Sequence, residues 1–239
     1  MSLKVLGFFV VVVALASPSL SYAQDSSSVK FLIGPIGGFN IISYNTNVFP
    51  TLSSEPSNFI AQDGSGIASF FGISSEIPLS SDMHDFLVLE ASYDSKSSGF
   101  VTYNGPFSDT STALSASLKY ILVNIGFKYN IMAGVAPTGI GVQLCASAGF
   151  LTSGYFNRML TIAPSTNVVT NQVPIDGANS IRFAIRGELT YDILLTSLFV
   201  LTPSVGYDNP FTKVDNTDRN WMAFSLYGAI ALRYAIGSF

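Results

Sequence analysis

Few residues in this chain combine a reactive side chain with a spacing that supports catalysis. The sequence has one histidine, His84, and one cysteine, Cys145. An enzyme needs a nucleophile or a base within reach of its substrate. His84 lies in a short polar turn, away from the serine-rich loops, so we expect a solvated turn residue. Cys145 is expected to face inward, with Gln143 and Ser147 as its neighbours on the same strand face, which favours a small filler residue over a reactive thiol. We therefore predict that the protein is not an enzyme.

Two short motifs resemble ligand sites but lack essential parts. Asp215-Asn216-Thr217-Asp218 has neither the following Gly nor the distal Glu of a calcium loop, so a solvated turn is expected. Gly139-x-Gly141 precedes a predicted strand instead of a helix and is not a phosphate cradle. We predict no metal and no cofactor. The net charge of −4 and the absence of a basic cluster argue against nucleic acid as a partner.

The composition favours a membrane protein. Hydrophobic residues make up 48% of the chain and charged residues only 11%, against roughly 25% charged in a typical soluble domain. After residue 23, no stretch approaches the ~18 apolar residues that a membrane-spanning helix needs. The apolar residues instead occur in short segments, broken at alternate positions. This dispersed pattern is typical of closed β-barrels in membranes.

The first 23 residues are predicted to be a secretory signal peptide. Lys4 precedes an apolar run from Val5 to Ala16, and Ser21-Tyr22-Ala23 is a small-x-small cleavage site. We expect residues 24–29 to be a short periplasmic segment and residues 30–239 to form an outer-membrane β-barrel. Both termini are then periplasmic, and outer-membrane lipid surrounds the wall.

Alternation with a period of two predicts eight antiparallel strands in an up-and-down meander. The expected strands are 31–44, 65–79, 87–94, 118–129, 140–154, 182–193, 198–207 and 221–235. Short links at 80–85, 133–138 and 194–197 alternate with long links at 45–64, 95–113, 155–181 and 208–220. Short periplasmic turns and long outer loops are what such barrels show.

The same alternation predicts which side chains face the lumen and which face lipid. An inward charge network is expected from Glu90, Asp94, Lys128, Arg186, Glu188 and Arg233. The interior of an eight-stranded barrel is just filled by side chains, so this network is either a neutralised plug or the lining of a gated pore. A periplasmic-side girdle of outward aromatic rings is expected from Phe31, Tyr129, Tyr191, Phe199 and Tyr234.

Several stretches resemble the eight-stranded outer-membrane barrel family typified by PorT-like proteins of Bacteroidetes. They are Gly37-Gly38-Phe39-Asn40, the run from Leu118 to Tyr129, Ala148-Gly149-Phe150 and Pro203-Ser204-Val205-Gly206-Tyr207. The resemblance implies an architecture and supplies no catalytic residues. The C-terminal Phe239 is out of phase with the outward face of the last strand. Either Gly237-Ser238 forms a bulge, or the strand ends at Tyr234.

Three functions follow from this interpretation, in order of preference. The first is a structural or partner-binding barrel that contacts a protein or lipopolysaccharide through its four long extracellular loops. The second is a narrow pore or small-ligand transport barrel. The third is a soluble, lipocalin-like barrel, which the outward Leu, Ile and Phe residues disfavour.

Overall fold

The computed structural model describes residues 31–44, 65–97, 101–104, 110–131, 137–162, 167–175, 177–216 and 221–237. For 101–114 and 158–171 the backbone alone is described. The predicted signal peptide, the segment 24–29, the long link 45–64 and Phe239 lie outside these ranges. Within the described residues, no helix is long and apolar enough to cross a membrane.

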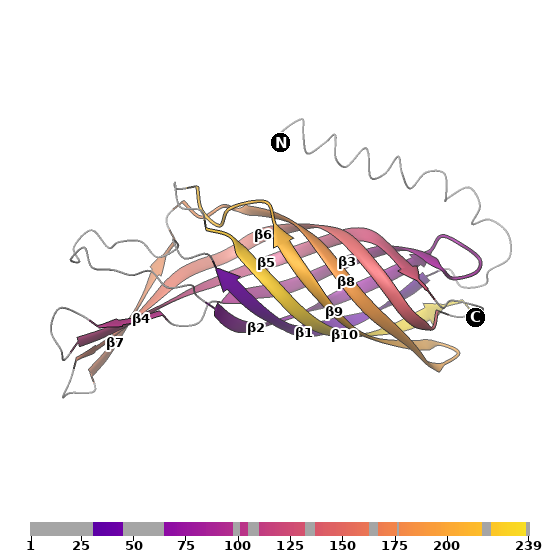
Figure 1. Ribbon diagram of the computed structural model, residues 1–239, viewed down its shortest axis with the longest axis horizontal. Coiled ribbons are helices and arrows are strands. Elements are labelled where there is room, and N and C mark those ends of the chain that lie inside the picture. The colour runs from indigo at the N-terminus through magenta and orange to yellow at the C-terminus, as the bar shows by residue number, and fades with distance from the viewer. Residues whose placement is uncertain are drawn as a thin grey trace.

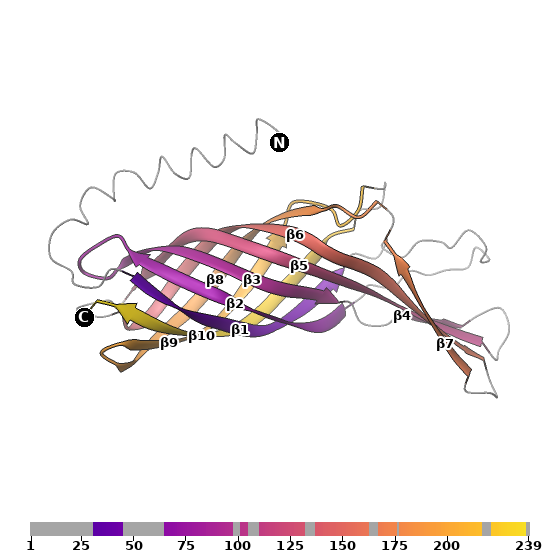
Figure 2. The same cartoon turned by 180° about the vertical axis from the view of Figure 1, so that it is seen from behind.

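Eight strands close into an antiparallel barrel, as the sequence predicts (Figures 1 and 2). Around the wall the order is β1, β2, β3, β5, β6, β8, β9 and β10, and β10 returns to pair with β1. The closing pair runs from Phe31 opposite Ile236 to Tyr44 opposite Ala223. The strands are β1 Phe31–Tyr44, β2 Ser65–Pro78, β3 Asp85–Ser97, β4 Val101–Asn104, β5 Thr110–Asn130, β6 Gly139–Ile162, β7 Asn167–Pro174, β8 Ile181–Thr196, β9 Phe199–Pro210 and β10 Ala223–Ile236.

The two ends of the barrel differ in the length of their connections. At one end, which we call the turn end, the links are residues 79–84, 131–138 and 197–198, and β10 finishes there. The first of these turns is closed by a 2.8 Å hydrogen bond from the Leu79 N–H to the Asp85 carbonyl. The other end, the loop end, carries the long connections.

Two of the expected loops are in part strands, so their prediction as loops is wrong. β5 begins at Thr110 and β6 continues to Ile162, and these two residues lie opposite each other. β4 pairs with the start of β5, and β7 pairs with the end of β6. The result is a four-stranded sheet, β4-β5-β6-β7, that projects beyond the barrel at the end opposite the C-terminus (Figure 1). Pairing between backbones builds this sheet, whereas the predicted strands depend on alternating large apolar residues.

The outer face of the wall is apolar. Side chains alternate between buried and exposed along the strands, and the exposed set is rich in Ile, Leu, Val, Phe and Tyr. Ile67 and Leu144, for example, are 74% and 60% exposed. Among the described wall residues that face outward, the charged side chains are Asp85 at the turn end and Lys119 toward the loop end. A soluble protein rarely exposes an apolar surface of this extent.

The last strand continues past Tyr234, the residue at which one of the two interpretations of the sequence ends it. β10 keeps its alternation to Ile236, which is exposed and in phase with Tyr234. The next residue, Gly237, has φ = 114°, a backbone conformation that disfavours other residues. The strand therefore ends at Ile236, just before Gly237, and the interpretation that it ends at Tyr234 is wrong.

Candidate functional site: the barrel interior

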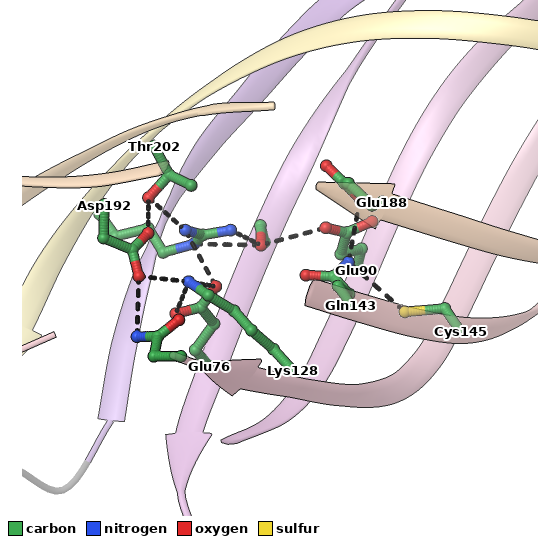
Figure 3. Close-up of polar contacts among 11 residues, drawn as sticks. Glu76, Glu90, Lys128, Gln143, Cys145, Glu188, Asp192 and Thr202 are labelled. Atoms are coloured by element: carbon green, nitrogen blue, oxygen red, sulfur yellow. Dashed lines mark hydrogen bonds and ion pairs between the residues drawn. The ribbon is translucent and has the colours of Figure 1, made fainter. Parts of the chain in front are cut away.

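The barrel interior is filled by three layers of charged and polar side chains, with an apolar cluster at each end and a third cluster beside the middle layer. The buried members of this third cluster are Ile36, Phe70, Tyr227, Ala229 and Ala231. Alternate residues of every wall strand point inward because side chains of a strand project to opposite faces. The layers are named here by their position between the turn end and the loop end. Figure 3 shows the lower and middle layers.

The lower layer, nearest the turn end, balances two cations against two carboxylates. The Lys128 ammonium lies 3.0 Å from Glu76 Oε1 and 2.6 Å from Asp192 Oδ2. Arg233 contacts Glu76 at 3.0 Å and also donates to the Thr202 hydroxyl at 2.8 Å. All four charged side chains are almost fully buried. Removing any one of them would leave an uncompensated buried charge.

The upper layer, nearest the loop end, is balanced in the same way. Lys96 lies 3.0 Å from Asp94 and 3.2 Å from Asp208, and Arg182 contacts Asp208 at 2.9 Å. The Asn40 amide donates to Asp94. Two cations again face two carboxylates.

The middle layer has two carboxylates and one cation. Glu188 accepts hydrogen bonds from the Gln143 amide at 3.1 Å and the Tyr227 hydroxyl at 3.0 Å. Arg186 lies 3.8 Å from Glu90, and its guanidinium lies over the Tyr227 ring, 4.1 Å from the centroid. With all groups ionised this layer carries one net negative charge.

Apolar clusters close both ends of the lumen. At the loop end Trp221 is fully buried, with its ring against Tyr44 (5.8 Å between centroids) and Phe156 (5.5 Å). The other buried members of this loop-end cluster are Ile42, Ala116, Leu118, Tyr120, Leu122, Ile175, Val214 and Ala223. At the turn end, the cluster is Leu32, Met83, Phe86, Val200 and Ala235.

Inward glycines make room for the large interior side chains. A Cβ added to Gly206 would lie 2.3 Å from the Tyr227 hydroxyl and 2.6 Å from the Gly187 carbonyl. A Cβ on Gly149 would meet the Leu122 side chain at 2.6 Å. By contrast, a Cβ on the outward Gly187 would have no atom within 4 Å.

All six residues of the predicted charge network lie inside the barrel, but in different layers. Lys128 and Arg233 are in the lower layer, Glu90, Arg186 and Glu188 in the middle layer, and Asp94 in the upper layer. Five further charged residues belong to the layers and are missing from the predicted set: Glu76, Lys96, Arg182, Asp192 and Asp208. Alternation alone already indicates an inward position for Arg182 and Asp192. The predicted strand ends at Tyr207, so Asp208 falls in a predicted loop.

The five predicted girdle residues lie near the turn end. Tyr129, Tyr191, Phe199 and Tyr234 are exposed, and Phe31 is half-buried. Tyr234 is opposite Phe199 in the β9–β10 register, with 5.4 Å between ring centroids.

His84 is half-buried, and the prediction of a solvated turn residue is wrong. Its Nδ1 is 2.6 Å from the Asn130 carbonyl, so that nitrogen carries the proton and donates. The ring also stacks on Tyr129, with 5.6 Å between centroids. In the same turn, hydrogen bonds from the Ser80 hydroxyl and the His84 N–H lower the pKa of Asp82. These contacts give His84 a part in closing the turn.

Two other predicted polar positions have different outcomes. Asp215 is buried, so its prediction as a solvated turn residue is wrong; it forms a bridge with Ala178 that joins the loop after β7 to the loop after β9. Thr217 and Asp218 lie outside the described residues. Cys145 is buried and faces inward, with the Gln143 amide 3.4 Å from its sulfur.

No protein-family model matches the chain, and no curated protein of similar sequence was found. Solved structures that match the chain include three bacterial proteins. Ail, the attachment invasion locus protein of Yersinia pestis, in complex with the heparin analogue sucrose octasulfate, is 8% identical with a TM-score of 0.39, over 86% of this chain and 99% of that one. Neisserial surface protein A is 12% identical with a TM-score of 0.38, over 84% and 96%. The outer membrane protein OprG from Pseudomonas aeruginosa is 11% identical with a TM-score of 0.42, over 88% and 97%. The fold class rests on this chain's own strand pairing: it is a closed, eight-stranded antiparallel β-barrel.

Proposed function

We propose that this protein is an integral outer-membrane β-barrel that works as a non-enzymatic structural or partner-binding component. The observation that carries the proposal is a filled, charge-paired interior inside a wall whose outer face is almost free of charge. A bilayer accepts such an outer face, because a closed barrel leaves no unpaired backbone group in the lipid. The girdle and the turn end then lie on the periplasmic side, with the loop end outside the cell. The signal peptide, the periplasmic termini and the kinship with PorT-like proteins stay predictions.

The interior supports a structural role over conduction. A conducting pore needs a continuous water-filled path, whereas in this lumen layers of buried ion pairs lie between two apolar clusters. Trp221 at the loop end and Phe86 at the turn end are both fully buried. Opening such a path would require breaking buried ion pairs, which costs several kcal/mol for each pair.

The projecting sheet supports a partner-binding role. Among the described residues, β4 pairs with β5 alone and β7 with β6 alone, so each has one free edge. An edge strand offers a row of backbone donors and acceptors to which an extended partner segment adds. A protein partner at this sheet fits that chemistry; lipopolysaccharide, the other predicted partner, would contact side chains around it.

A narrow pore is the second candidate, and one observation favours it. Several buried polar atoms in the lumen have no hydrogen-bond partner among the described residues, including Ser92 Oγ, Ser147 Oγ and Thr190 Oγ1. Buried polar groups of this kind are usually satisfied by internal water. A file of such waters between the layers would be the route of a narrow conduit.

Two measurements test the proposal. The first is the gel mobility of the protein purified in mild detergent, unboiled and boiled; a mobility difference is expected for a closed, detergent-resistant barrel. The second is conductance in planar bilayers, where silence is expected. Channels that are retuned by Glu90→Gln or Arg186→Gln would establish the pore instead. A protein that stays in solution without detergent would refute membrane residence.

A further inference from the structure

The charge balance of the interior differs between its layers. The lower layer pairs Lys128 and Arg233 with two carboxylates, and the upper layer pairs Lys96 and Arg182 with two carboxylates. In the middle layer Arg186 is the one cation. An uncompensated charge in a closed lumen is costly, so it is expected to be neutralised.

The charged and titratable groups around the excess charge come from five strands. Glu90 is on β3, Cys145 on β6, Arg186 and Glu188 on β8, and Tyr227 on β10, while Asp208 of the upper layer, on β9, also acts on Arg186. Arg186 is 3.8 Å from Glu90, and its guanidinium lies over the rings of Tyr227 and Phe70, so one cation serves two carboxylates and two aromatic rings. Figure 3 shows Glu90, Glu188 and Gln143 grouped together, apart from the lower layer.

Uncharged oxygen atoms near the two carboxylates complete the set of atoms that would contact a bound cation. Gln143 donates its amide nitrogen to Glu188, and Asn124 donates its own to Glu90 at 3.0 Å. The carbonyl oxygens of both amides are buried and have no hydrogen-bond partner among the described residues, and both side chains are at least 98% buried. Ser147 Oγ, opposite Asn124 in the β5–β6 register, is also buried without a partner. These oxygens are acceptors that would be satisfied by a cation and its water.

We propose that the middle layer binds one sodium ion between Glu90 and Glu188. The charge count calls for a single positive charge. Oxygen donors suit a hard cation. Within the described residues, no three His, Cys, Asp or Glu side chains converge as they would for a divalent or transition metal. The site goes beyond the proposed function, because a structural barrel needs no bound ion.

Glu188→Gln tests the site, with Asp192→Asn as the matched control. Both variants make the same chemical change, but the first removes the excess charge and the second unbalances the lower layer. Unfolding midpoints of the protein in mild detergent would be measured in sodium chloride and in N-methylglucamine chloride at equal ionic strength, and across pH. Asp192→Asn is expected to lower the midpoint under every condition.

One result supports the proposal: the midpoint of the wild type rises by about 5–10 °C in sodium at a hundredfold excess over the dissociation constant, and Glu188→Gln abolishes the rise. If sodium has no effect, and the wild type instead loses stability as the pH rises, a proton on one of the carboxyl groups neutralises the layer and the sodium site is refuted. If neither sodium nor pH affects the wild type, or if both variants are destabilised alike and keep the wild-type dependence, the site does not exist. Glu90→Gln provides the same test if Glu188→Gln does not fold.

Discussion

Replacing Lys128 by methionine is expected to destabilise the barrel strongly. The ammonium makes contacts of 3.0 and 3.2 Å with the two Glu76 oxygens and of 2.6 Å with Asp192, in a site where all three side chains are fully buried. Methionine has a similar length but no charge, so the lower layer would keep Arg233 as its only cation. Breaking a buried pair in this way costs about 3–5 kcal/mol. A loss of this size is expected as a lower urea midpoint with an unchanged slope of the free energy against urea concentration.

A double variant separates charge imbalance from lost contacts. Asp192 accepts a hydrogen bond from Asn130 at Oδ2 (3.0 Å) and one from Thr202 at Oδ1 (2.7 Å). An asparagine at this position keeps the first through its amide oxygen and donates its NH2 to the Thr202 hydroxyl, which can accept as well as donate. Lys128→Met combined with Asp192→Asn restores one cation against one carboxylate. It should therefore recover most of the stability lost by the single variant.

The assay is urea unfolding in lipid vesicles, followed by the fluorescence of the single tryptophan, Trp221, and by the mobility of unboiled samples on gels. If the Lys128 variant lies within about 1 kcal/mol of the wild type, the lower layer is well hydrated and the argument from buried charge fails. If the double variant is as unstable as the single one, lost contacts outweigh charge balance.

Three further predictions follow from particular positions. Gly206→Val should prevent folding or shift β9, since its Cβ would meet Tyr227 and a backbone carbonyl, whereas Gly187→Val should fold normally in the same gel assay. Leu144→Arg, on the exposed wall, should cost about 2–4 kcal/mol if it lies near the bilayer midplane; an unchanged urea midpoint in vesicles would contradict a lipid-facing wall. The lowered pKa of Asp82 implies that its ionised form favours the folded turn, a contribution present above the unfolded pKa and lost as the pH falls through the folded one. Asp82→Asn should accordingly reduce the loss of stability measured below about pH 4; an identical pH profile would show that the turn is insensitive to this charge.

The strands and the facing of their side chains could be predicted from the sequence because both depend on a period of two. For seven of the eight wall strands, the predicted first residue lies within two residues of the observed one. The exception is the fourth wall strand, β5. The projecting sheet could not be predicted in this way, because β4 and β7 are held by pairing with β5 and β6 and not by a one-sided apolar pattern.

The partners within the lumen could be predicted only in part. Alternation indicates that Lys128 and Arg233 face inward, but it does not say that both share Glu76. That contact depends on the stagger between strands far apart in the chain. Asp208 illustrates a second limit, since a strand that continues three residues past its apolar run brings a loop-like residue into the interior.

The layers of charged side chains also help to specify the register between neighbouring strands. Because successive side chains face opposite sides, a slip of one residue between two strands would move a whole inward set to the outer face. Such a slip in β8 would expose Arg182, Arg186, Glu188 and Asp192 to lipid and would leave their partners alone inside. A barrel with charged side chains in lipid and unpaired charges inside would be much less stable than the native one, so the interior favours the correct register during folding. The ion pairs would thus disfavour barrels with the wrong register, in addition to holding together the barrel that its first and last strands close.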